Sequence, residues 1–289
     1  HTRDCRRDRH QAGSAPNSSR EVRSACLSPP RAQHSVPRAS GHSCPAWRLQ
    51  AVPALVPPDL PPGRRWKRLK PAWRAEVEWF NEPGGMMDQT VCALGGTQLI
   101  EFDPVYNPVL LPVPPGTWVL FDSMEPKDTL GILSRAKDRR LELIGEWEML
   151  GGLDWNLRPP EFPGHWTKED QRLMMTTLEN RRISSEGAMA LSESTPDLAQ
   201  IGSLLQEHHQ WLSQGIEVST PRIDRILKCA QESGAMGGKI NGSGGGGTGF
   251  VVCQSRHNFA VIEAIDKAGG QPFSVALGAQ GVRIEQPLN

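Results

Sequence analysis

The chain has 289 residues, a formal net charge of zero and 37% hydrophobic residues, which is enough for one large domain or two ordinary ones. No apolar run is long enough to span a membrane, and the polar start of the chain lacks the apolar core of a signal peptide. The six cysteines are scattered without a Cys-x-x-Cys pair, as is usual for thiols in a reducing compartment. These features argue against a membrane-spanning or disulfide-stapled protein and predict a cytoplasmic one.

The first quarter of the chain differs in composition from the rest. Residues 1–73 are basic and rich in Arg, Ser and Pro, whereas the chain after Arg74 is net acidic. Prolines crowd the second half of this segment, up to Pro61 and Pro62, and proline breaks helices. We therefore expect residues 1–73 to be a disordered segment, because it cannot bury enough apolar surface to offset chain entropy.

Two other interpretations of this segment stay open. The basic residues 64–70 are also typical of a nuclear-localisation or nucleic-acid-binding patch. Arg-, Pro- and Ser-rich text without periodicity is also what a wrong reading frame through GC-rich DNA produces. An out-of-frame origin is therefore a further hypothesis, which a nucleotide sequence with an intact frame and protein-like codon usage would contradict.

Regular elements are predicted from residue 74 onward. Residues 75–80 read as the end of a helix, and Gly95-Gly96 stops a second helix over 86–94. Residues 97–102 and 118–121 have the composition of strands, and residues 127–146 have helical composition and charge spacing.

The last part of the chain alternates between helix and strand signals. Residues 169–189 predict a long helix, and Thr195-Pro196 and Thr220-Pro221 each read as an N-cap followed by Pro at the first helical position. A strand over 250–253, a helix over 258–267 and a strand over 273–277 complete the chain. This order predicts an α+β fold with helices packed on a sheet.

A glycine-rich run covers residues 237–249 and leads straight into the apolar Phe250-Val251-Val252. Because glycine costs conformational entropy, such a run between ordered elements usually brings bare backbone against a ligand. Consecutive N–H groups can form a concave nest for phosphate, with Lys239 and Ser243 as further polar members. The run is not a Walker A sequence. A flexible Gly/Ser linker is the alternative interpretation.

Asp88 is a candidate for proton transfer. It lies in the first turn of the predicted helix after Gly84-Gly85, where the helix dipole and free N–H groups favour a charged carboxylate. Such a group can accept a proton from a substrate hydroxyl or orient it. The alternative is an Asp that serves only the start of the helix.

The pair His208-His209 suggests a metal site at first sight. Adjacent residues on a helix point about 100° apart, so the two imidazoles cannot both bind one ion. His208 falls on the apolar stripe, and we expect a core or groove residue. No metal ligand is assigned.

Taken together, two segments make the chain resemble the GHMP kinases, and most closely their galactokinase-like sugar kinases. Gly84-Gly85-Met86-Met87-Asp88-Gln89, with Ala93-Leu94-Gly95-Gly96 behind it, resembles the catalytic-aspartate segment of that superfamily. The stretch 238–247 resembles its third conserved motif. Further similar text is found at Phe121-Asp122-Ser123, Arg139-Arg140, Glu207-His208-His209, Val218-Ser219-Thr220-Pro221 and Asp224.

The resemblance covers residues 74–254 at least, and it implies both a fold and an activity. The fold would be a ferredoxin-like two-layer C-terminal domain over 117–289, with a remnant of the ribosomal S5-like N-terminal domain over 74–116. The activity would be transfer of the γ-phosphoryl group of ATP, with Mg²⁺, to a sugar hydroxyl at the anomeric carbon. Asp88 would be the catalytic base, and Gly85 and Asp88 would contact the sugar. The ATP site would include Gly242, Ser243, Gly244, Gly245, Gly246 and Gly247.

The chain also departs from the family pattern. A Pro-Gly-x-x-x-Leu-x-Gly-Glu-His-like first motif and a Gly-Leu-Ser-Ser-Ser-Ala-like second motif are both absent from the sequence. Ala136-Lys137-Asp138 stands where sugar kinases often have a tyrosine, which puts galactose itself in doubt. We therefore expect a galactokinase-like chain that is truncated and impaired in turnover. A sugar-binding regulatory protein without activity and a nucleic-acid-associated protein using residues 1–73 are the alternatives.

Overall fold

The computed structural model describes residues 62–79, 85–101, 106–127, 138–150 and 162–281. Residues 1–61, which are most of the segment expected to be disordered, lie outside these ranges. So do Ala136 and Lys137, which stand where sugar kinases often have a tyrosine.

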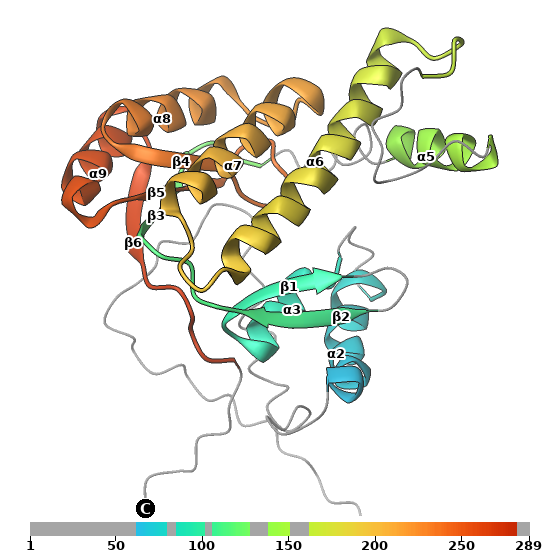
Figure 1. The fold of residues 1–289 in the computed structure, drawn as a ribbon, viewed down its shortest axis with the longest axis horizontal. Helices are drawn as coiled ribbons and strands as arrows, with labels where there is room; N and C mark the ends of the chain where they lie inside the picture. Colours follow the sequence, from blue (N-terminus) through green and yellow to red (C-terminus); the bar gives the residue numbers. More distant parts are fainter. Residues whose placement is uncertain (1–61, 80–84, 102–105, 128–137, 151–161, 282–289) are drawn as a thin grey trace, which may run out of the picture. The chain divides into compact units, whose positions relative to one another are not determined.

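Two helices and a two-stranded ribbon form the first described part of the chain (Figure 1). Helix α2 (Pro62–Val77) and helix α3 (Met87–Leu94) pack through a small core of Leu69, Met86 and Ala93. The expectation of disorder up to residue 73 is therefore wrong for residues 62–73. Pro62 starts α2 instead of breaking it, because a proline in the first turn loses no helical hydrogen bond.

Strands β1 (Thr97–Glu101) and β2 (Asn107–Leu111) form an antiparallel ribbon after α3. The predicted stop at Gly95-Gly96 is confirmed, since both glycines have positive φ angles of 67° and 66°. Strand β2 was not predicted because it contains Pro108, and proline is tolerated only at the edge of a sheet.

A four-stranded antiparallel sheet forms the centre of the second part, in the order β4-β5-β3-β6. Its strands are β3 (Thr117–Asp122), β4 (Ala235–Ile240), β5 (Thr248–Cys253) and β6 (Gln271–Val275). Strand β3 lies between two partners, and Val119 pairs with Val251 in β5 and Ser274 in β6. The predicted final strand is confirmed, although it ends at Val275 rather than at 277.

Helices α8 (Pro221–Glu232) and α9 (Asn258–Lys267) cover one face of this sheet. Their apolar side chains, among them Ile223 and Val261, share one core with Val119 and Val251. The other face meets α7 (Leu198–Gln210), because a Cβ on Gly237 of β4 would collide with Gly202 of α7. The arrangement is visible in Figure 1 and confirms the α+β class.

The long helix α6 (Lys168–Ser192) and helix α5 (Arg139–Met149) pack against each other beside this sheet (Figure 1). Their core combines Leu143 and Met174 with the edge-to-face pair Trp147 and Trp166. An ion pair of 2.7 Å between Arg139 Nε and Asp170 Oδ1 adds to the contact.

Two predicted helix starts are corrected and one is confirmed. Helix α7 begins at Leu198 with Asp197 as its N-cap, so Thr195-Pro196 lies outside the helix. Asp197 rather than Thr195 is the N-cap because its carboxylate accepts a hydrogen bond from Ala199 N–H. Of the helix expected over 127–146, residues 128–137 lie outside the described ranges, Lys127 is not helical, and the described helix begins at Arg139. Thr220 does cap α8, as predicted.

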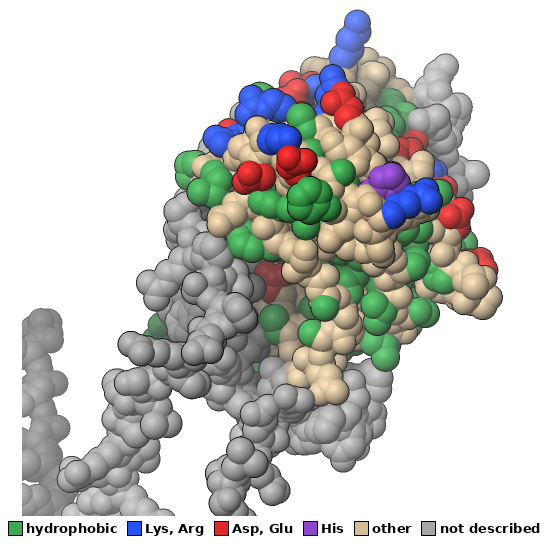
Figure 2. All heavy atoms as spheres, turned by 90° about the vertical axis from the view of Figure 1, so that its left-hand side faces the viewer, with side chains coloured by type: hydrophobic (Ala, Val, Ile, Leu, Met, Phe, Trp, Pro, Cys, Tyr) green, Lys and Arg blue, Asp and Glu red, His purple; other side chains and the backbone are tan. Residues whose placement is uncertain are grey.

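Figure 2 shows the surface on the side of α8 and α9, where Lys and Arg side chains lie intermixed with Asp and Glu. A face of mixed sign is typical of a solvated surface. Within the described ranges, no helix is long and apolar enough to cross a membrane.

Candidate functional site

The glycine run divides into a strand and a loop. Residues 237–240 belong to strand β4, which corrects the expectation of a loop over the whole run. Residues 241–247, here called the glycine loop, connect β4 to β5. Five glycines of this loop have φ angles between 74° and 110°, namely Gly242, Gly244, Gly245, Gly246 and Gly247. Side chains rarely tolerate this region of φ, so the glycines are required by the backbone path.

Backbone hydrogen bonds fix the glycine loop to two other segments. Gly245 N–H donates to Val218 O at 2.8 Å, and Gly247 N–H donates to Glu125 O at 3.0 Å. Ser123 N–H donates in turn to Gly247 O at 2.8 Å. These bonds contradict the interpretation of a flexible linker. They also occupy two of the donors that a phosphate nest would use.

The same contacts leave no room for side chains on the loop. A Cβ on Gly244 would lie 2.4 Å from Val218 O, and one on Gly246 would lie 2.6 Å from Pro126 O. The loop therefore packs directly on the backbone after β3 and the backbone before α8. These are two of the stretches quoted for the family resemblance, 121–123 and 218–221, which the structure brings together with the glycine loop.

Lys127 is a neighbour of the glycine loop that sequence reasoning missed. Its stem passes Gly247, where a Cβ would lie 2.7 Å from Lys127 Cε, and its ammonium lies near Gly242, at 3.0 Å from a Cβ position. Among the described residues no carboxylate forms an ion pair with it. The contact joins residues far apart in the chain, so no local sequence signal could have revealed it.

Asp88 lies in the first turn of α3, as predicted, and its side chain is exposed. Met86 occupies the N-cap position without a side-chain hydrogen bond, so Asp88 is not the cap of this helix. A Cβ on the preceding Gly85 would meet nothing within 4 Å. Among the described residues, neither a hydrogen bond nor an ion pair joins Asp88 to the glycine loop. The roles of Gly85 and Asp88 stay predictions.

A partly buried polar network lies beside the start of the glycine loop. His209 Nε2 and Asp224 Oδ1 are 2.9 Å apart, and Asp224 also accepts hydrogen bonds from the hydroxyls of Ser213 and Ser219 at 2.9 and 2.6 Å. Burial raises the pKa of Asp224, but the hydrogen bonds from His209, Ser219 and Ser213 outweigh it and lower the pKa below its ordinary value. Asp224 is therefore held as a carboxylate.

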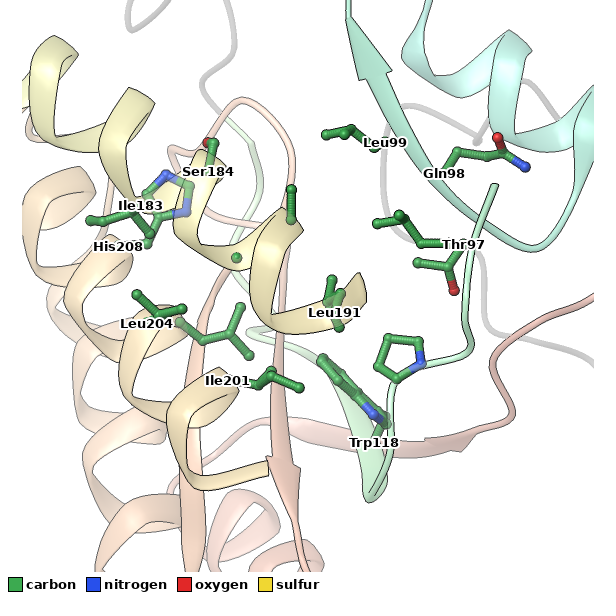
Figure 3. A pocket seen from close by; sticks show the side chains of 15 residues that line it. Thr97, Gln98, Leu99, Trp118, Ile183, Ser184, Leu191, Ile201, Leu204 and His208 are labelled. Atoms are coloured by element: carbon green, nitrogen blue, oxygen red, sulfur yellow. The ribbon is translucent and has the colours of Figure 1, made fainter. Parts of the chain in front are cut away.

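An apolar pocket of about 270 Å³ lies between β1 and the helices α6 and α7 (Figure 3). Leu99 and Trp118 line it from the strands, and Ile183 and His208 line it from the helices. This confirms the expectation of a groove position for His208. Burial, the charge of Lys239 and the neighbouring His209 lower the pKa of His208 to about 4. Neither Asp88 nor the glycine loop lines this pocket, so we assign it no part in phosphoryl transfer.

The described residues fit one of the two expected cofactors better than the other. The glycine loop offers a close backbone approach that suits a phosphate group. For a magnesium ion, the described ranges hold no group of three His, Cys, Asp or Glu side chains that could bind a metal. We therefore derive no step through Mg²⁺.

Comparisons with known proteins agree with this geometry. Residues 188–271 match the family described as GHMP kinases C terminal. The mevalonate kinase of Thermococcus onnurineus is 35% identical over 89 residues, which are 31% of this chain and 26% of that enzyme. This part of the chain is thus similar to the C-terminal domain of the GHMP kinases.

The chain is also similar to galactokinases over a longer stretch. The galactokinases of Streptomyces coelicolor and Streptomyces lividans are 28% and 33% identical to it over 265 and 234 residues. These matches cover 86% and 74% of this chain and 66% and 55% of the relatives. The structure of Lactococcus lactis galactokinase complexed with galactose superimposes with a TM-score of 0.66 at 17% identity, covering 85% of this chain and 68% of that one. This likeness supports the fold alone.

Two further facts follow from the lengths of the matches. The chain spans from about a quarter to two thirds of the length of these curated relatives. An alignment over 86% of this chain is also longer than residues 74–289, so the Streptomyces coelicolor match extends into residues 1–73. This weighs against an out-of-frame origin for the whole of that segment.

Proposed function

We propose that this chain carries the C-terminal part of an ATP-dependent sugar kinase. The observation that carries the proposal is the glycine loop, whose positive φ angles and backbone contacts hold bare backbone in a fixed path. The family matches support it, since they combine a GHMP kinase C-terminal domain with galactokinase relatives. In this proposal residues 74–116 are the remnant of an N-terminal domain that carries Asp88, and residues 117–289 are the C-terminal domain.

The proposed reaction moves one phosphoryl group. A sugar hydroxyl oxygen attacks the γ-phosphorus of ATP, the bond to the β–γ bridging oxygen breaks, and ADP leaves. Asp88 accepts the proton of the attacking hydroxyl. The N–H groups of Ser243, Gly244 and Gly246, which remain beside the two engaged donors, would face the phosphate oxygens and stabilise their charge.

We infer that turnover by this chain is weak. The first and second motifs of the family are absent from its sequence, and phosphoryl transfer depends on positioning and charge stabilisation. Loss of even one such donor typically costs on the order of a hundredfold in rate.

A coupled assay of ADP release with galactose and ATP tests the proposal. We expect slow turnover that depends on galactose and disappears in Asp88→Asn. The matched control is Asp266→Asn, because Asp266 is an exposed carboxylate on α9, remote from α3 in the sequence. Turnover that survives Asp88→Asn unchanged would overturn the role of Asp88, and robust wild-type turnover would overturn the inference of impairment.

A sugar-binding protein without kinase activity is the second candidate, and the absent motifs favour it. Calorimetry with galactose separates the two, because this candidate predicts measurable sugar binding without ADP release. A chain that binds neither galactose nor ATP would contradict both proposals.

A further inference from the structure

The carboxylate of Asp224 bonds to residues from α7, from the turn after α7 and from the segment before α8. Ser213 follows α7, Ser219 precedes α8, and His209 lies in the last turn of α7, and all three bond to this one side chain. Hydrogen bonds to a charged acceptor in a partly buried site are stronger than neutral ones. Asp224 therefore fixes the relative positions of these segments.

The first connection runs through His209 to the start of the glycine loop. His209 Nδ1 accepts a hydrogen bond from the backbone N–H of Ile240 at 3.3 Å. Since Nδ1 is the acceptor, Nε2 carries the proton and donates it to Asp224 Oδ1. Ile240 is the last residue of β4 and directly precedes the loop. The imidazole thus connects Asp224 to the strand end from which the loop departs.

The second connection runs through Ser219 to the middle of the loop. Ser219 is adjacent to Val218, whose carbonyl accepts the N–H of Gly245 at 2.8 Å. Thr220 follows, and its hydroxyl donates to the Glu125 carboxylate at 2.5 Å. The carbonyl of the same Glu125 accepts the N–H of Gly247. Both backbone acceptors of the loop are thereby held in place by residues next to the Asp224 network.

We propose that Asp224 is a positioning residue that fixes the glycine loop in its ligand-binding path through His209 and Ser219. The ligand class, a nucleotide phosphate, rests on the proposed function, whereas the fixation of the loop does not. Asp224 touches no ligand in this proposal. Its effect on binding is indirect, through the N–H groups that the loop presents.

Hydrogen exchange of the full chain tests the fixation directly. In Asp224→Ala we expect the hydrogen-bonded amides of Ile240, Gly245 and Gly247 to exchange about tenfold faster or more than in wild type, because local opening becomes easier. Asp224→Asn removes the charge and keeps the shape, so it decides the question if the alanine variant does not fold. Wild-type exchange in the folded Asn variant and, where it folds, in the Ala variant would overturn the proposal.

The control is Asp170→Asn. Asp170 is also a carboxylate with several hydrogen bonds, from Arg139 and from Thr167, but it lies at the contact of α5 and α6. We expect this variant to lose stability without faster exchange of the same three amides. Equally fast exchange of these amides in Asp170→Asn would show a global effect and would count against a specific role of Asp224.

A binding measurement separates this proposal from the proposed function. Calorimetry with ADP is expected to show affinity that falls about tenfold in Asp224→Ala and stays unchanged in Asp170→Asn. If wild type binds no ADP but the loop amides respond to Asp224, the kinase proposal fails and the positioning role stands. If wild type binds ADP and the Asp224 variants bind it equally well, the positioning role fails.

Discussion

Gly202 in α7 and Gly237 in β4 approach so closely that a Cβ on Gly237 would lie 1.8 Å from the carbonyl oxygen of Gly202. In the opposite direction, a Cβ on Gly202 would lie 2.6 Å from Met236 O. The helix can pack on the strand at this distance only because both residues lack side chains. Helix α7 also carries His209, so this contact sets the position of the polar network beside the start of the glycine loop.

We expect Gly202→Ala to destabilise the protein by about 2–3 kcal/mol, because the methyl group must push α7 away from β4. The matched control is Gly187→Ala in α6, where a Cβ would meet nothing within 4 Å. That change is expected to stabilise the protein by about 0.5–1 kcal/mol, since alanine favours helix. Chemical denaturation measures both free energies of unfolding. A neutral Gly202→Ala would contradict the close packing.

Two substitutions within the glycine loop are expected to differ in cost. Gly244→Ala combines a positive φ with a clash against Val218 O, and we expect a loss of about 2–4 kcal/mol. Gly242→Ala has a similar φ but meets only the flexible end of Lys127. Its expected cost is therefore only about 1 kcal/mol. Denaturation of the two variants in parallel checks the order, and equal costs would show that the loop shifts freely.

Much of the fold could be predicted because the signals were local. Thr220-Pro221 gave the start of α8, and the glycine pair after α3 gave its end, since caps and positive φ depend on neighbouring residues. The failures have equally local causes. Thr195-Pro196 has the pattern of a helix start, but Asp197 is the N-cap of α7. The prolines before α2 argued against a helix, which is stabilised by the packing of Leu69.

Several contacts of the candidate site could not be predicted from local sequence signals. The glycine-rich run 237–249 was identified by its composition, yet residues 237–240 form part of β4, because they pair with β5 across a hairpin. The contact of Lys127 with Gly242 and Gly247 could not be predicted, because residues this far apart in the chain leave no local signal. The bond from Asp224 to His209 likewise depends on the packing of α8 near α7.

Lys127 is expected to contribute to anion binding at the glycine loop. Its ammonium lies beside Gly242, where it would attract a phosphate group without fixing the direction of the hydrogen bond. We expect Lys127→Met to weaken ADP binding about five- to tenfold at low salt, and less at high salt because exposed charges are screened. Lys228→Met on α8 is the control, since Lys228 is also exposed. Unchanged ADP affinity in Lys127→Met would rule out this role.

The lowered pKa of His208 predicts a loss of stability in acid. The unfolded chain takes up a proton near its ordinary value of 6.5, whereas the folded imidazole, with a pKa of about 4, resists protonation. Stability is therefore fully present above pH 6.5 and falls as the pH drops from 6.5 toward 4. After allowance for partial exposure, the loss is on the order of 1–2 kcal/mol.

Urea denaturation at pH 7 and pH 5 of wild type and His208→Gln measures this loss. The variant cannot take up the proton, so we expect it to lose less stability between the two pH values than wild type does. His165→Gln serves as the control, because His165 is exposed and lies against Glu146 at the surface. If His208→Gln and wild type lose the same free energy of unfolding, the imidazole titrates normally and the wall of the pocket in Figure 3 is more open to water than its packing indicates.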